Sequence, residues 1–243
     1  MSSQVAGNLD QLVERLRKSL VDDVLSVILY GSAATGDAHD KFSDLNVLCV
    51  LRQITPAQLA AAETVFHWWR EQGNPAPLLL TEHEVRTSTD CFAIEFYDIK
   101  RHHRVLYGAD VVADLAIDDS FYRGQVEHEL RAKLLRLRQK ASGVLSDKKA
   151  LCDLLVDSVS TFCVLFRHAL ILHGCENVSR KREIIELARQ RFGIDPAPFL
   201  TLLDLRQENA KGQNAAPEKL LGEYLKEIGK VIDAVDVLEK GVS

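Results

Sequence analysis

The sequence predicts an α/β domain with a small mixed sheet, followed by an all-α helical bundle. Two observations carry this prediction. Short apolar runs rich in β-branched residues alternate with helical stretches in the first part of the chain, whereas almost every later segment has helical periodicity. The change falls near residue 115, so we expect two domains, 1–115 and 116–243.

The first domain begins with a helix over 8–22, where leucines recur at helical spacing. The run 24–30 is short, apolar and β-branched, which is typical of a buried strand, and a second strand is expected over 44–51. Thr55-Pro56 is typical of a helix start, with Thr55 as the N-cap. The remaining expected elements are the rest of that helix to Gln72, strands over 77–81 and 91–99, and a short extended segment over 106–108.

The second domain is expected to contain helices and no strand. Gly174, Gly193 and a polar stretch over 209–217 mark the breaks between them. The expected helices cover 121–142, 148–173, 180–192, 196–207 and 217–239.

Composition excludes several classes of protein. The 243 residues include 30 Lys and Arg against 35 Asp and Glu, a formal net charge of −5, and 47% are apolar. This charge does not indicate a protein that coats nucleic acid, although a local basic groove remains possible. No uninterrupted apolar run approaches the roughly 18 residues of a membrane span, and no secretory signal opens the chain, so we expect a cytoplasmic protein without a membrane partner. Its five cysteines are expected to be free thiols.

A strand followed by Gly31-Ser32 is the most specific feature of the sequence. Eleven residues later, Asp44-Leu45-Asn46 opens the next strand. A glycine allows another group to approach the backbone closely, and a hydroxyl with N–H groups at a helix start binds phosphate well. Because side chains two apart on a strand share a face, Asp44 and Asn46 point the same way. Oxygen ligands beside a phosphate-binding turn are what a magnesium–nucleotide complex requires.

These residues resemble the signature of the DNA polymerase β-type nucleotidyltransferase superfamily. The pattern is an apolar residue, Gly-Ser, a spacer and Asp-x-Asp or Asp-x-Glu, and it covers Leu29 to Leu51 here. The chain looks closest to the bacterial branch that joins a minimal nucleotidyltransferase domain to a helical domain, as in aminoglycoside nucleotidyltransferases. The resemblance implies that Gly31 and Ser32 hold NTP phosphates, and that Asp44 and Asn46 hold Mg²⁺.

Asn46 departs from the signature, because the family has a second acidic residue there. An amide oxygen can still ligate Mg²⁺, but it contributes no charge. Mg²⁺ needs only one or two carboxylates plus substrate phosphates, so binding through Asp44 is expected to survive, whereas a second metal is weakened. Asp37 or Asp40 could supply a substitute ligand.

The third carboxylate of that branch lies on a later strand, and the segment 92–99 looks like it. On a strand, Phe92, Ile94 and Phe96 share the face expected in the core, which points Glu95 away from it. Glu95 would complete the metal site or accept the proton of the attacking hydroxyl. Asp98 is the alternative candidate for the third carboxylate.

Two further sequence patterns are less specific indicators of function. The basic run 100–104 could bind phosphates, or it could be an ordinary solvated loop. Arg167 and His173 have the Arg-x5-His spacing of helical ribonuclease domains that often accompany minimal nucleotidyltransferases, although residues six apart do not share a helix face.

The expected function is Mg²⁺-dependent transfer of NMP from an NTP to a hydroxyl acceptor, in a cleft between the two domains. Asp44 and Glu95 are the candidate catalytic residues. The alternative is a degenerate relative that binds a nucleotide as a sensor or partner subunit, and a toxin–antitoxin ribonuclease or its antidote is the third reading. The acceptor, the base of the NTP and the oligomeric state all stay open.

Overall fold

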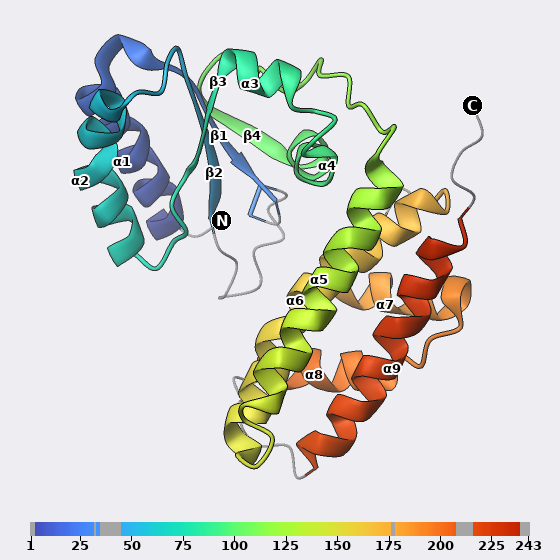
Figure 1. The fold of residues 1–243 in the computed structure, drawn as a ribbon. Helices are drawn as coiled ribbons and strands as arrows, with labels where there is room; N and C mark the ends of the chain where they lie inside the picture. Colours follow the sequence, from blue (N-terminus) through green and yellow to red (C-terminus); the bar gives the residue numbers. More distant parts are fainter. Residues whose placement is uncertain (1–2, 32, 35–44, 176–177, 208–215, 239–243) are drawn as a thin grey trace. The chain divides into compact units, whose positions relative to one another are not determined.

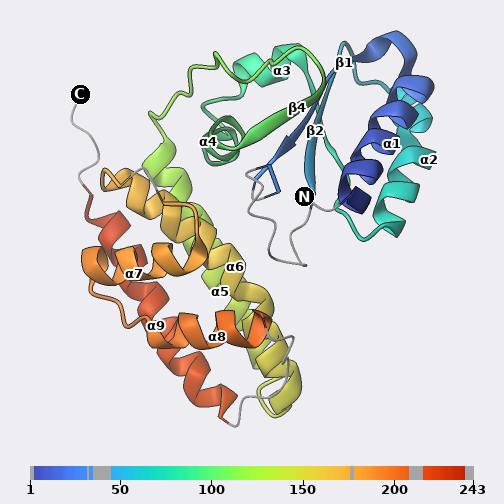
Figure 2. The same cartoon turned by 180° about the vertical axis from the view of Figure 1, so that it is seen from behind.

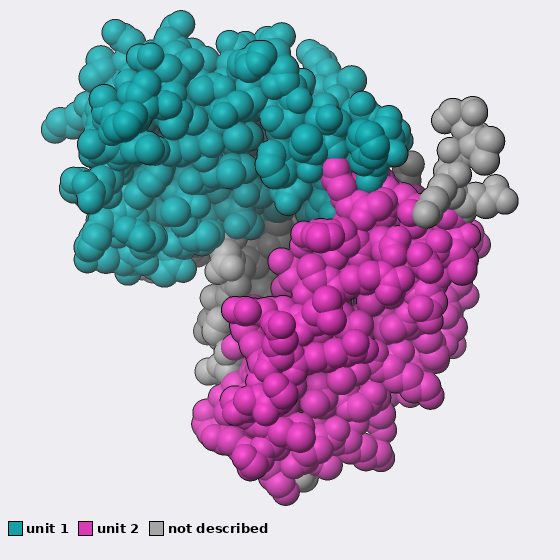
Figure 3. All heavy atoms as spheres, viewed as in Figure 1, with its two compact units in different colours: residues 1–121 teal, residues 122–243 magenta. Residues whose placement is uncertain are grey.

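A computed structural model describes residues 3–31, 33–34, 45–175, 178–207 and 216–238 (Figure 1). The chain divides into two compact units, unit 1 over 1–121 and unit 2 over 122–243 (Figure 3). The domain bounds expected from the sequence, 1–115 and 116–243, stay a prediction.

The described strands of unit 1 form a four-stranded mixed sheet in the order β3-β2-β1-β4. The strands are β1 Val24–Tyr30, β2 Asn46–Leu51, β3 Leu78–Thr81 and β4 His103–Gly108. β1 is antiparallel to both of its neighbours, β2 and β4, whereas β2 and β3 are parallel. A small mixed sheet in unit 1 and helices in unit 2 confirm the fold class predicted from the sequence.

The central strand β1 is buried on both faces of the sheet. Val27 and Leu29 point to the face covered by α1 (Ser3–Leu20) and α2 (Pro56–Glu71). Ile28 points to the opposite face, which is covered by α3 (Glu82–Thr87) and α4 (Ala93–Arg101). Figures 1 and 2 show these two pairs of helices on opposite sides of the sheet. A strand covered on both sides reads as a continuous apolar run, which explains why its bounds could be predicted.

The start of α2 also agrees with the prediction. Thr55 is the N-cap, and its side chain and that of Gln58 form a reciprocal capping box. Gln58 in addition donates a hydrogen bond to Asp23 at 2.9 Å, which ties the helix start to the turn before β1.

The strand expected over 91–99 is wrong, because this segment forms the helix α4. Its buried residues, Ala93, Ile94, Phe96 and Ile99, follow helical spacing, whereas Phe92 is 49% exposed. The alternation of Phe92, Ile94 and Phe96 was therefore a coincidence of a short apolar run that fits both periods. The strand that completes the sheet is β4, and it begins before the extended segment expected over 106–108.

Unit 2 is a bundle built around α6, which packs against every other described helix of the unit (Figure 2). Aromatic rings of α6, α8 and α9 form its centre: Phe199 lies 5.2 Å from Phe166 and 5.0 Å from Tyr224 between ring centroids. The helices begin and end close to the expected positions. They are α5 Tyr122–Ser142, α6 Lys148–Leu172, α7 Lys181–Phe192, α8 Ala197–Gln207 and α9 Pro217–Asp236.

One described helix, α6, is long and apolar enough to cross a membrane by length and composition. Its best window has a mean hydropathy of 1.6, and 56% of that window is buried inside the structure. Leu155, Val159 and Phe162 are among its fully buried residues. A core helix passes the same test, and the packing of α6 in the bundle accounts for its apolar character.

Gly108 at the end of β4 cannot carry a side chain. It has φ +79°, and a Cβ there would lie 1.9 Å from the carbonyl oxygen of Leu25. We expect Gly108→Ala to lower the free energy of unfolding by more than about 2 kcal/mol, because β1 and β4 must separate locally.

Gly73 is the matched control for this prediction. It has φ +82°, but a Cβ there would meet nothing within 4 Å. Gly73→Ala should therefore cost only the left-handed backbone penalty, about 1 kcal/mol. Urea unfolding of the two variants measures the difference, and equal losses would contradict the role of the β1–β4 contact.

Candidate functional site

Three side chains form a row across the sheet. Tyr30 at the end of β1 is the register partner of Asn46 on β2 and of His103 on β4. Directly paired residues on neighbouring strands share a face. Tyr30 packs against the cluster that contains Phe96 and Ile99, so this is the face that α4 covers. We call Asn46, Tyr30 and His103 the polar row.

Gly31 follows the polar row directly and turns the chain. Its φ of +79° lies in the left-handed region, which favours glycine. Its N–H donates to the carbonyl oxygen of His102 at 2.9 Å, and its carbonyl accepts from the N–H of Ala34 at 3.0 Å. A Cβ on Gly31 would lie 3.4 Å from Nδ2 of Asn46. The structure therefore brings Gly31 and Asn46 together, as the motif requires.

Two of the expected site residues, Ser32 and Asp44, lie outside the described residues. Ala33 and Ala34 lie in a turn, so the helix start expected after Gly31 is not seen in the residues described there. Because the N–H of Gly31 is already bonded to His102, Gly31 contributes its backbone conformation to the turn and no free donor.

Glu95 does not lie on a strand, which corrects the argument that selected it. β3 and β4 contain no acidic residue, so neither later strand carries a carboxylate. Glu95 and Asp98 instead lie on α4, where Glu95 is exposed. Burial raises the pKa of Tyr30 most, and the negative charges of Glu95 and then Asp98 raise it further. Both carboxylates therefore act electrostatically on the polar row, and Glu95 and Asp98 both remain candidates for the third carboxylate.

The described residues contain no ready-made metal centre. Among them, no group of three or more His, Cys, Asp or Glu side chains could hold a metal ion. Asn46 supplies an amide beside Gly31, and the α4 carboxylates act on Tyr30, the register partner of Asn46. The expected ligand Asp44 would be added to these groups.

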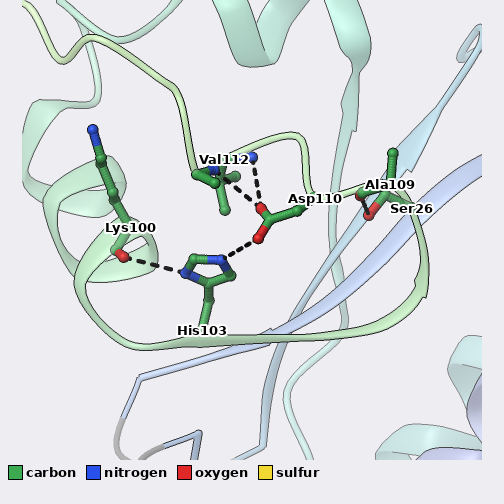
Figure 4. Close-up of polar contacts among 7 residues, drawn as sticks. Ser26, Lys100, His103, Ala109, Asp110 and Val112 are labelled. Carbon is green, nitrogen blue, oxygen red and sulfur yellow. Dashed lines mark hydrogen bonds and ion pairs between the residues drawn. The ribbon is translucent and has the colours of Figure 1, made fainter.

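His103 of the polar row pairs with Asp110, and the sequence did not predict this pair (Figure 4). Nε2 of His103 lies 2.9 Å from Oδ2 of Asp110, in the loop after β4. In the sequence, His103 stood out only as a member of the basic run over 100–104. Its pairing with Asp110, seven residues away, depends on how β4 and the following loop close, which local periodicity does not report.

Arg167 and His173, the expected ribonuclease spacing, lie on and just after α6. His173 is the C-cap of that helix, and its ring meets the ring of Phe192 edge-on with 5.0 Å between centroids. Burial and then the charge of Arg191 lower the pKa of His173, although a hydrogen bond that the ring donates to the backbone of Ala234 opposes them. His173 thus has a packing role against α7.

The chain matches no family model and no curated protein. Among solved structures it is similar to spectinomycin adenyltransferase AAD(9) from Enterococcus faecalis, a structure with ATP and spectinomycin. The TM-score is 0.64, the identity is 14%, and the match covers 95% of this chain and 99% of the other. The two chains therefore share a fold over almost their whole lengths.

The position of α4 beside the polar row can be tested through Tyr30. A nearby carboxylate disfavours the phenolate, so Glu95→Gln should lower the pKa of Tyr30 towards the ordinary value. The measurement is the ultraviolet absorbance of phenolate during alkaline titration, with Tyr30→Phe identifying the signal.

Glu63→Gln is the control, because Glu63 is an exposed carboxylate on α2, which covers the opposite face of the sheet. It should leave the Tyr30 titration in place. An unchanged Tyr30 titration in Glu95→Gln would show that Glu95 does not act on the polar row.

Proposed function

We propose that the protein is a Mg²⁺-dependent nucleotidyltransferase that moves NMP from an NTP to a hydroxyl acceptor. The observation that carries the proposal is the placement of Gly31, directly after β1, beside Asn46 at the start of the neighbouring strand β2, with Asp44 two positions earlier in the sequence. The shared fold with an adenyltransferase whose structure contains ATP supports it, and makes ATP the first donor to test.

In this proposal, each group has a separate task. The turn at Gly31-Ser32 holds the triphosphate, and Asp44 with the amide oxygen of Asn46 holds Mg²⁺, which neutralises the phosphate charge. Glu95 or Asp98 on α4 accepts the proton of the attacking hydroxyl or completes the metal site. The acceptor is a hydroxyl compound, and spectinomycin is the first candidate because the structural neighbour was solved with it.

A degenerate nucleotide-binding protein is the second candidate function, and Asn46 favours it. Two-metal transfer places two cations close together, and carboxylates offset their repulsion. A neutral amide at this position leaves one negative charge fewer than the Asp-x-Asp pattern. Binding of one Mg²⁺–nucleotide complex needs fewer negative charges than nucleotidyl transfer does. A sensor or partner subunit would therefore still bind the nucleotide but would not transfer NMP.

Nucleotide binding can be tested without knowing the acceptor. We expect one or more of the four NTPs to raise the melting temperature in the presence of Mg²⁺ and to have less effect without it, because a ligand that binds the native state stabilises it by mass action. A thermal-shift panel measures this. No stabilisation by any NTP would contradict both candidate functions.

Asn46→Asp separates the two functions. The added carboxylate lies beside Gly31 and should strengthen the second metal site, so we expect Mg²⁺-dependent transfer to rise about tenfold or more. Transfer of label from α-labelled ATP to spectinomycin and to other hydroxyl acceptors measures the change.

Gln53→Glu is the matched control for added charge. Gln53 is exposed and follows β2 at the end of the strand opposite to Asn46. It should leave transfer unchanged. If the wild type is fully active and Asn46→Asp adds nothing, the amide at position 46 is not the limiting feature of this site.

A further inference from the structure

His103 is held from both sides of its ring. Nδ1 lies 3.2 Å from the backbone carbonyl oxygen of Lys100, and Nε2 lies 2.9 Å from the carboxylate of Asp110 (Figure 4). Both partner atoms are hydrogen-bond acceptors, so each ring nitrogen faces a group to which an N–H can donate. The side chain is 15% exposed, which limits competition from water. His103 thus links the end of α4 to the loop after β4.

Asp110 is itself fixed in place. Its second carboxylate oxygen accepts hydrogen bonds from the N–H groups of Val112 and Ala113, at 3.2 and 3.0 Å. Burial acts to raise the pKa of Asp110, but the hydrogen bonds from His103 and these backbone groups together hold it below its ordinary value. The buried hydroxyl of Ser26 on β1 donates to the carbonyl of Ala109 at 2.7 Å, which ties the start of this loop to the sheet.

The segment that His103 holds is the one that contacts the turn at Gly31. Lys100 to His103 leads from α4 into β4, and the carbonyl of His102 in its middle accepts the N–H of Gly31. Lys100 is anchored a second time, because its amino group donates to the carbonyl of Leu115 at 2.6 Å. A chain of direct contacts therefore runs from Asp110 through His103 to the backbone at Gly31.

We propose that His103 and Asp110 are positioning residues that hold the Lys100–His103 segment so that the Gly31 turn fits the phosphates of a bound NTP. This inference rests on the proposed function. Neither residue needs to touch the nucleotide; the pair acts through the His102–Gly31 hydrogen bond. The same segment ends α4, so the pair also holds the helix that carries Glu95 and Asp98.

Asp110→Asn tests the pair with almost no change in shape. The amide oxygen can still accept from Val112 and Ala113, but the amide group facing His103 is a donor opposite a donor. We expect the Kd for Mg²⁺–ATP, measured by calorimetry, to rise about tenfold. Hydrogen exchange of the Gly31 amide should become faster, while the amides of Val27 and Leu29 in the middle of β1 keep their protection.

A double-mutant cycle separates positioning from a general loss of structure. His103→Gln should weaken Mg²⁺–ATP binding similarly, and the double variant should be no weaker than either single variant, because both act through one contact. Asp114→Asn is the control, since it removes the same charge from an exposed position in the same loop, and it should change neither readout.

The outcomes are distinguishable. Unchanged affinity or unchanged Gly31 exchange in Asp110→Asn, with wild-type binding intact, overturns the positioning role and leaves the proposed function standing. Additive losses in the double variant overturn it as well, because the two residues would then act separately. A wild type that binds no nucleotide overturns the proposed function and this inference with it.

Discussion

The burial of β1 between two layers of helices is the constraint on which the rest of unit 1 depends. Because β1 pairs with both β2 and β4, its register decides which residues meet at the end of the sheet. That register sets Asn46 and His103 on either side of Tyr30, with Gly31 directly after it. A shift of one residue would turn every side chain of β1 to the wrong face, so the apolar pattern that builds the core also fixes the polar row.

The candidate site combines three kinds of contribution that come from different parts of unit 1. The strands supply the turn at Gly31 and, at the start of β2, Asn46, where the Asp-x-Asp pattern would have a carboxylate. α4 supplies the carboxylates, Glu95 and Asp98, whose influence reaches Tyr30. The loop after β4 supplies Asp110, which holds His103 and thereby the backbone next to Gly31. A net charge of −5 for the chain does not reveal this distribution. Under the proposed function, the carboxylate that Asn46 lacks distinguishes nucleotidyl transfer from nucleotide binding alone.

The sequence predicted the parts of the fold that local chemistry determines. β1 and the Thr55 cap of α2 were found because a doubly buried strand and a capping residue leave strong local patterns. The segment 91–99 was misassigned because Phe92, Ile94 and Phe96 alternate as a strand would, whereas only tertiary packing shows Phe92 to be exposed. The neighbourhood of Gly31 and Asn46 followed from the spacing of the motif. The pairing of His103 with Asp110 did not, because it depends on the closure of a loop over the end of the sheet.

Paramagnetic broadening by Mn²⁺–ATP tests the location of the site most directly. Mn²⁺ has the same preference for oxygen ligands as Mg²⁺, and it broadens the backbone amide signals of residues close to it. The account predicts the strongest broadening at Gly31 and Asn46 and weaker broadening at Glu95 on α4. Broadening centred on any other part of the chain, with Gly31 and Asn46 unaffected, would contradict it.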